Sequence, residues 1–268
     1  MENGRIHMDK TSVIGLILGL IAIGVGMVLK GADLAALLEP AAFLIILLGT
    51  VAAVTIAFPG SVLKKVPALF KKLFFEEKQT DSKELIVLFM DWADQTRKEG
   101  LLSLENQVNE VDDPFLSSGL QLAIDGQSPD FIKDVMIEKI EAMEQRHEEG
   151  AAIFSQAGTY APTLGVLGAV IGLIAALADM SDIDALGHAI SAAFVATLLG
   201  IFTGYVLWHP FANKLREKSK REVMQKELIV EGVLSITTGD SRLIVQEKLG
   251  SLLSSKELAE LQKRDSDG

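Results

Sequence analysis

The sequence has 268 residues, of which 49% are hydrophobic, and its formal net charge is −11, from 25 Lys and Arg against 36 Asp and Glu. This composition is unusual for a soluble domain, because the apolar residues gather in a few long uncharged runs. The excess of acid argues against binding to nucleic acid, which requires a clustered basic face. The chain has no Cys, which excludes disulfides, thiolate nucleophiles and Cys-based metal sites.

The acidic residues lie outside the apolar runs. Residues 59–150 carry 11 basic and 19 acidic side chains, whereas residues 211–268 carry 11 basic and 10 acidic side chains. The sequence therefore consists of membrane segments, one acidic aqueous region and one roughly neutral tail.

Four runs lack Asp, Glu, Lys and Arg over a length sufficient to cross a hydrocarbon core, which takes about 20 residues as a helix. They are residues 11–29, 40–63, 151–178 and 185–213. Inside a bilayer the backbone polar groups must be paired within the segment, so these runs are expected to be helices. The sequence predicts an all-α integral membrane protein with four transmembrane helices, a large helical cytoplasmic domain between helices 2 and 3, and a helical C-terminal cytoplasmic tail.

Lys and Arg near the ends of the runs predict their orientation. Basic residues follow the second and fourth runs closely, whereas the only charged residues of the short hairpin at residues 179–184 are three Asp. Both termini and the middle loop are therefore expected in the cytoplasm. The predicted divisions are residues 1–10 (N-terminus), 11–63 (first transmembrane hairpin), 64–150 (cytoplasmic domain), 151–210 (second hairpin) and 211–268 (C-terminal helices and tail).

Turn and capping signals divide the aqueous parts into helices. Asp81 can cap a helix that ends at Gly100, and Asp113 can cap a second helix that ends at Gly126. A third helix is expected to continue without a break from residue 129 to residue 178, a length of roughly 75 Å at about 1.5 Å per residue. After the fourth run we expect a helix that ends near Gly239 and a last amphipathic stretch over residues 241–261.

The four apolar runs contain no Asp or Glu. Carboxylates inside the membrane are the usual proton relays, so a protein that moved ions by its own carboxylate would be expected to have one there. Asp33 and Glu39 lie between the first two runs, within reach of water. If the protein takes part in ion transport, the titrating acid must come from a partner chain.

The third and fourth runs are rich in Gly, Ala and Ser, which let helix backbones approach closely in lipid. Packing within one subunit explains such residues, and their density also favours a wider interface around a helix of another protein. Pro162 removes a backbone donor and releases the carbonyl of Gly158, and Pro210 does the same near the inner end of the fourth run. Each proline is either purely structural or a point of flexing.

Polar side chains in these two runs include Thr159, Thr197, Thr203 and Tyr205. A Thr within a span usually donates to the carbonyl four residues earlier, so each hydroxyl is either satisfied by its own helix or faces a pore. No motif of a nucleophile with its base, no metal-binding motif and no phosphate-binding loop is present in the sequence. We therefore expect no enzyme activity, metal or cofactor.

Several long stretches of the sequence carry a family resemblance. They are GAAIFSQAGTYAPTLGVLGAVIGL at residues 150–173, LGHAISAAFVATLLG at residues 186–200, HPFANKL at residues 209–215 and RKEGLLSLE at residues 97–105. They resemble the motility protein A family of bacterial flagellar stators, within the MotA/TolQ/ExbB proton channel superfamily. The order of spans and loops is similar over nearly the whole chain.

The resemblance implies that the protein lies in a bacterial inner membrane and has partners on both sides of it. Five copies of the chain would surround the single spans of a dimer of motility protein B, whose Asp carries the ion and whose periplasmic domain binds peptidoglycan. Arg97 and Glu105 match the charged pair with which the family contacts the rotor protein FliG. Membrane lipid is the remaining partner, and no nucleic acid is expected.

The resemblance also implies roles inside the membrane. Pro162 and Pro210 match prolines that couple ion flow to movement, and Thr197 matches a threonine that faces the ion pathway. Ala169 and Ala196 stand where sodium-driven relatives tend to have Thr, and the missing hydroxyl oxygens favour protons over a hard cation. The residues predicted for the ion pathway and its coupling are Pro162, Pro210, Thr197, Ala169, Ala196, Thr159 and Tyr205.

The sequence leaves two other functions open. One is an energiser of a periplasmic partner of the ExbB and TolQ type, which has similar third and fourth spans but usually three spans in all and an external N-terminus. The other is a stand-alone ion channel or transporter, against which the absence of an intramembrane acid argues.

Overall fold

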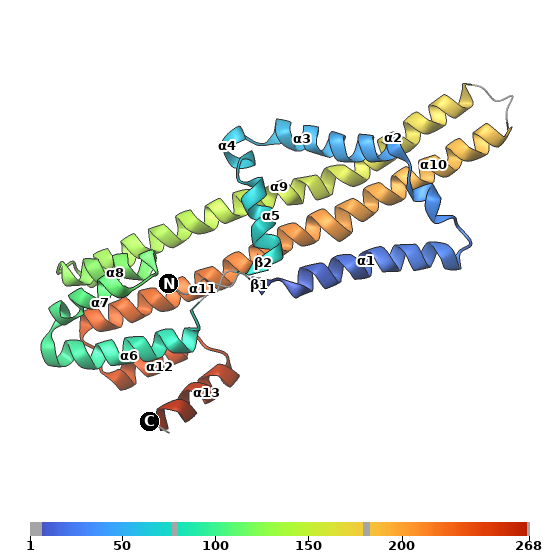
Figure 1. The fold of residues 1–268 in the computed structure, drawn as a ribbon. Helices are drawn as coiled ribbons and strands as arrows, with labels where there is room; N and C mark the ends of the chain where they lie inside the picture. Colours follow the sequence, from blue (N-terminus) through green and yellow to red (C-terminus); the bar gives the residue numbers. More distant parts are fainter. Residues whose placement is uncertain (1–6, 77–79, 179–182, 267–268) are drawn as a thin grey trace. The chain divides into compact units, whose positions relative to one another are not determined.

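A computed structural model describes residues 7–76, 80–178 and 183–266 of the chain (Figure 1). The chain divides into two compact units, the first formed by residues 1–78 and 147–217 and the second by residues 79–146 and 218–268. Two long helices, α9 (Pro129–Leu177) and α11 (His209–Thr238), contribute residues to both units.

The first unit holds the apolar helices together with a short two-stranded antiparallel sheet. Besides parts of α9 and α11, its elements are β1 (His7–Met8), α1 (Lys10–Leu29), the 3-10 helix η1 (Leu34–Leu37), α2 (Pro40–Phe43), the π-helix η2 (Leu44–Leu48), α3 (Gly49–Ala57), α4 (Gly60–Leu63), α5 (Val66–Phe74), β2 (Phe75–Glu76), α10 (Ile183–Phe202) and the π-helix η4 (Thr203–Trp208).

The second unit is entirely helical over the residues that the structure describes. Besides parts of α9 and α11, its elements are α6 (Ser82–Glu99), the 3-10 helix η3 (Leu101–Leu104), α7 (Glu105–Glu110), α8 (Pro114–Ile124), α12 (Arg242–Gly250) and α13 (Ser255–Ser266).

Within the described residues, four helices are long and apolar enough to cross a membrane, and each passes through one of the predicted runs: Lys10–Leu29, Leu34–Ala57, Pro129–Leu177 and Ile183–Thr238. The predicted all-α membrane fold with four transmembrane helices is thereby confirmed. The third of these helices is continuous over 49 residues, as predicted.

The second apolar run differs from the prediction at its end. The helix stops at Ala57 rather than at Leu63, and Phe58 is extended with φ −125° and ψ 143°. Pro59 causes the break, because a proline disfavours the helical conformation of the residue before it and offers no N–H. The chain then continues in two short helices, α4 and α5.

Helix α5 packs its apolar side against α9 and α11 within the first unit. Leu73 is fully buried beside Phe154 and Ala212, with Phe70 and Phe211 at the edge of the same cluster. The rings of Phe70 and Phe154 meet edge to face, with centroids 5.2 Å apart, an arrangement that aromatic pairs prefer. Chain segments that follow the second span are therefore held against the third and fourth.

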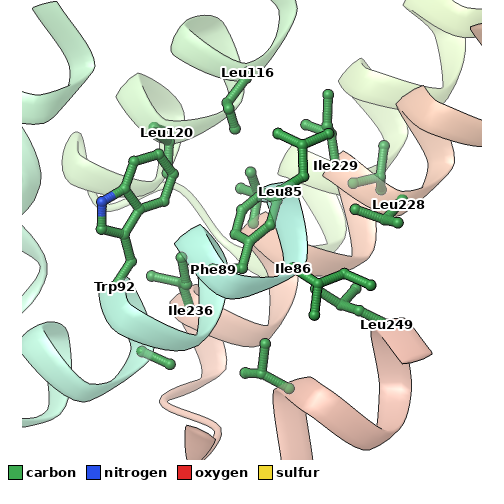
Figure 2. Packing of buried hydrophobic residues seen from close by; sticks show 14 of the residues in the cluster. Leu85, Ile86, Phe89, Trp92, Leu116, Leu120, Leu228, Ile229, Ile236 and Leu249 are labelled. Carbon is green, nitrogen blue, oxygen red and sulfur yellow. The ribbon is translucent and has the colours of Figure 1, made fainter. Parts of the chain in front are cut away.

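The second unit encloses its own hydrophobic core, to which α6, α8, α9, α11 and α12 all contribute (Figure 2). Phe89 is fully buried and meets Trp92 edge to face at 5.6 Å. Gly232 of α11 lies against Phe89, since a Cβ there would come within 2.5 Å of the ring. This core fixes the helices that position the exposed end of α6.

Capping side chains begin two helices of the second unit, and glycines follow their ends, where the sequence predicted. Asp81 accepts a hydrogen bond from Lys83 N at 3.0 Å, and Asp113 accepts one from Phe115 N at 2.8 Å. Gly100 and Gly126 follow α6 and α8 with φ values of 83° and 74°, a region that favours glycine.

The C-terminal stretch differs from the single amphipathic segment predicted over residues 241–261. It forms two helices, α12 and α13, separated by a turn at residues 251–254. Ser254 explains the second start, because its hydroxyl donates to Glu257 and its backbone N–H donates to the same carboxylate at 3.0 Å. The predicted external hairpin at residues 179–184 lies largely outside the described residues.

Candidate functional site

Helices α9 and α10 approach each other backbone to backbone. A Cβ on Gly165 would lie 2.8 Å from the carbonyl oxygen of Ala196 and 2.9 Å from Cα of Gly200. A Cβ on Gly200 would lie 2.8 Å from the carbonyl oxygen of Ala161. Only glycines permit this approach, because any side chain would meet main-chain atoms that cannot rotate away.

Pro162 lies one turn from this crossing, inside α9, and is half-buried. A proline cannot donate to the carbonyl four residues earlier, which here belongs to Gly158. The facing residue is Gly204, where a Cβ would come within 2.8 Å of both the Gly158 oxygen and Cγ of Pro162. The Gly158 carbonyl, which lacks its helical donor because of Pro162, therefore faces Gly204 near the start of the π-helix η4.

Pro210 is the second residue of α11 and is exposed. The π-helix η4 (Thr203–Trp208) ends two residues before it. In a regular α-helix the proline ring would collide with the carbonyl four residues earlier, and a wider turn relieves that collision. The two predicted prolines thus act on facing segments of the chain, Pro162 on α9 and Pro210 on η4.

His209 joins the same neighbourhood, a contact that the sequence did not predict. Its ring lies against Gly158, where a Cβ would come within 2.8 Å of the ring carbons. Tyr205 is 64% exposed and packs on His209, with ring centroids 5.3 Å apart. Residues of η4 and α11 thereby surround the segment of α9 that Pro162 interrupts.

The two predicted pathway threonines use their hydroxyl protons within their own helices. Thr159 donates to Ser155 O at 3.1 Å and is exposed, and Thr197 donates to Ala193 O at 3.1 Å and is half-buried. Each hydroxyl oxygen keeps lone pairs with which it can accept a further hydrogen bond.

The two predicted alanines are both buried, Ala169 at 9% and Ala196 at 4% exposure. The Ala196 methyl group lies 3.7 Å from the position that a Cβ on Gly168 would take. A Thr at either position would place a hydroxyl group in a buried environment, where it would need a hydrogen-bond partner.

An ion pair with a buried carboxylate joins three segments of the first unit, and no sequence pattern predicted it. Asp9 has only 2% of its side chain exposed and lies 2.6 Å from Lys214 Nζ. Its other carboxylate oxygen accepts from Thr11 N at 3.1 Å and caps α1, while its backbone N–H donates to Phe74 O at 2.8 Å. Asp9 thus links α1, the end of α5 and α11. Asp9 stands at a capping position, but its ion-pair partner is far away in the sequence.

A second ion pair links α9 to α11 outside the apolar runs. Arg216 donates to Glu148 through Nε at 2.8 Å and through Nη2 at 2.6 Å. The hydrogen bond from Arg216 holds the pKa of the Glu148 carboxyl below its ordinary value, and the same bond raises the pKa of Arg216. The forked geometry is the strong form of such a pair.

Arg97 and Glu105 belong to the second unit and stand on either side of a corner between α6 and α7. Both side chains are exposed. Gly100, with φ 83° and ψ 167°, ends α6, and the 3-10 helix η3 carries the chain into α7, whose first residue is Glu105. The structure therefore separates the predicted site residues into a membrane group in the first unit and an exposed corner in the second.

The membrane group has no titrating acid of its own, because the apolar runs contain neither Asp nor Glu. Among the described residues no group of three or more His, Asp or Glu side chains could hold a metal ion. The geometry can support close helix packing, local rearrangement at two prolines and contact with another membrane helix. These features define a class of four-span helical membrane proteins whose third and fourth spans pack backbone to backbone.

Comparisons with known proteins assign the chain to a family within this class. The MotA/TolQ/ExbB proton channel family matches residues 107–228, and the motility protein A N-terminal family matches residues 13–100. The chain belongs to the MotA/TolQ/ExbB proton channel family.

Its relatives include motility protein A of Bacillus subtilis (strain 168), which is 62% identical over 93% of this chain and 93% of the relative. A solved chain of the flagellar MotAB stator complex from B. subtilis has a TM-score of 0.89 and 61% identity, covering 94% of this chain and 99% of that chain. A chain of the C. jejuni MotAB structure has a TM-score of 0.87 and 29% identity, covering 92% of this chain and 97% of that chain.

Replacing Gly165 by Ala tests the backbone contact between α9 and α10. The added methyl group would meet main-chain atoms at 2.8 to 2.9 Å, so the helices must separate, at a cost of about 1–3 kcal/mol. We expect a lower midpoint of thermal unfolding for the detergent-solubilised protein. Gly172→Ala on the same helix is the control, because a Cβ there has no neighbour within 4 Å. Equal midpoints for the two variants would contradict the proposed role of Gly165.

Proposed function

We propose that the chain is the larger membrane subunit of a flagellar stator, which with a motility protein B partner converts an ion gradient into rotor torque. The single observation that carries the proposal is the match to a chain of a solved stator complex, with a TM-score of 0.89 over 94% of this chain. The role is that of an ion-conducting machine rather than an enzyme.

The partner subunit supplies the group that this chain lacks. All four apolar runs are free of Asp and Glu, and a carboxylate is the usual proton relay at membrane depth. We propose that the Asp of motility protein B carries the ion and that five copies of this chain surround a dimer of that partner. The periplasmic domain of the partner then anchors the assembly to peptidoglycan.

The distribution of basic residues supports an orientation with both termini in the cytoplasm. Exposed Lys64, Lys65, Lys71 and Lys72 follow the second span, and Lys and Arg side chains concentrate on the cytoplasmic side of spans. The protein then resides in the bacterial inner membrane, and its second unit faces the rotor.

Ion binding is coupled to movement through the contacts between the partner's Asp and the surrounding helices. Protonation removes a charge that is costly in the membrane, and this changes which helix contacts are favourable. Pro162 lies beside the Gly158 and Gly204 approach, and Pro210 follows the π-helix η4 that contains Gly204, so both prolines lie where the third and fourth spans must adjust. One charge crossing 100 mV releases about 2.3 kcal/mol, which is sufficient to rearrange a few such contacts.

Protons are the proposed coupling ion. Ala169 and Ala196 offer no side-chain oxygen, whereas a sodium ion requires several oxygen ligands. Thr159 and Thr197 donate to carbonyls of their own helices and leave only two hydroxyl oxygens, fewer than the several oxygen ligands that a sodium ion requires. Tyr205 is exposed beside His209 at the inner end of the same pathway.

Co-purification and energisation test the proposed function together. A tagged copy of this chain is expected to retain a single-span partner with an intramembrane Asp through detergent purification. Cells that depend on this stator are expected to stop swimming when the proton gradient is collapsed and to continue when only the sodium gradient is removed. Purification of the chain alone, with ion flux in liposomes, would instead favour a stand-alone channel.

Charge reversal at the α6–α7 corner tests the rotor contact. Arg97→Glu or Glu105→Lys is expected to lower torque strongly while leaving assembly in the membrane intact, because both side chains are exposed. Stall torque in a tethered-bead assay and the amount of membrane-bound complex are the two measurements. Lys133→Glu, which has the same charge change as Arg97→Glu and lies at an exposed position of α9 in the same unit, is the control. Normal swimming of both corner variants would remove these residues from the contact.

Pro162→Ala tests the coupling role of the third span. The alanine restores an N–H that can donate to Gly158 O and removes the ring that faces Gly204. We expect the complex to assemble in normal amounts and swimming speed to fall. Pro129→Ala serves as control, because Pro129 is the first residue of the same helix, where a missing N–H costs little. Unchanged torque and speed across all loads would exclude Pro162 from the mechanism.

A further inference from the structure

The corner between α6 and α7 carries one exposed leucine between Arg97 and Glu105 in the sequence. Leu102 is 70% exposed, although Leu104 is 1% exposed and Leu101 packs against the core of the second unit. The 3-10 helix η3 (Leu101–Leu104) thus turns two of its leucines inward and presents the third to the outside.

Hydrogen bonds hold this turn in one conformation. Ser103 donates through Oγ to Gly100 O at 2.7 Å, and Gln95 donates through Nε2 to Ser103 O at 3.1 Å. Gln107 donates in turn to Gln95 Oε1 at 3.0 Å. The backbone that carries Leu102 is therefore already ordered, so less conformational entropy is lost when Leu102 binds a partner.

The position of Leu102 relates it to the proposed rotor contact. It follows Arg97, at the end of α6, and precedes Glu105, at the start of α7. Exposed charge pairs contribute little in water, and contacts that exclude water around them strengthen the interaction. An apolar side chain between two charged ones supplies that exclusion.

We propose that Leu102 enters an apolar depression on the rotor protein FliG and seals the Arg97 and Glu105 contacts from water. The inference rests on the proposed stator function and adds a residue to its rotor contact. The complementary surface must offer an acid opposite Arg97, a base opposite Glu105 and an apolar recess between them.

Leu102→Ala tests the proposal in the assembled stator complex. Removing most of an apolar side chain from a sealed contact is expected to weaken binding of the purified complex to immobilised FliG by about 5- to 10-fold. Stall torque per stator in a tethered-bead assay is expected to fall at least about twofold, and Leu102→Met is expected to retain binding and torque because it keeps a similar apolar volume.

Met224→Ala provides a matched control. Met224 is 59% exposed in the same unit, and its neighbour Gln225 donates to Thr80 O at 3.1 Å. Thr80 lies next to the start of α6, so Met224 stands near the opposite end of that helix from Gly100. Wild-type binding and torque are expected for this variant.

The outcomes separate the inference from the function on which it rests. Loss of torque in Arg97→Glu with normal binding and torque in Leu102→Ala overturns only the role of Leu102. Normal torque in Arg97→Glu and Glu105→Lys overturns the rotor contact itself. An equal loss in Met224→Ala, or a change in the amount or oligomeric state of the complex with Leu102→Ala, also overturns the proposal, because Leu102 would then act in folding or assembly.

Discussion

The close backbone approach between the third and fourth spans is the constraint on which the rest of the membrane unit depends. In lipid, apolar side chains gain little by leaving the solvent, so helices associate through close packing. Gly165 and Gly200 provide that packing on α9 and α10, and Gly158 and Gly204 extend it to η4. Pro162 and Pro210 act on these facing segments, so any rearrangement that they permit changes the contact that holds the two spans together.

The two units differ in where their charged side chains lie. Charged side chains are costly inside a bilayer, and the apolar runs contain neither Asp nor Glu. In the proposed stator, a partner brings its own carboxylate and alters the electrostatic environment of the spans without disturbing an Asp or Glu of this chain. The second unit has a hydrophobic core of its own around Phe89 and Trp92, which holds Arg97, Leu102 and Glu105 in place as an exposed corner.

Local signals in the sequence predicted much of the fold but less of the site. Asp81, Asp113 and Gly100 mark helix ends through interactions with nearby backbone, so their roles could be predicted. The break at Pro59 and the split after Gly250 were missed, because apolar composition and amphipathic pattern continue across both positions. The site residues Pro162 and Gly158 were recognised, but their neighbours Gly204 and His209 were not assigned to them, since helix packing brings together residues that are distant in the chain.

By itself, the sequence determined the four apolar helices, the capped helices between them and the absence of a carboxylate in the membrane. These properties follow from composition and from interactions over a few residues. Only the tertiary structure decided that Asp9 pairs with Lys214, that His209 lies on Gly158 and that Leu102 is exposed while Leu104 is buried. Each of these three features depends on how the helices pack against one another. The sequence pattern does not show which side of a helix or turn meets a neighbour.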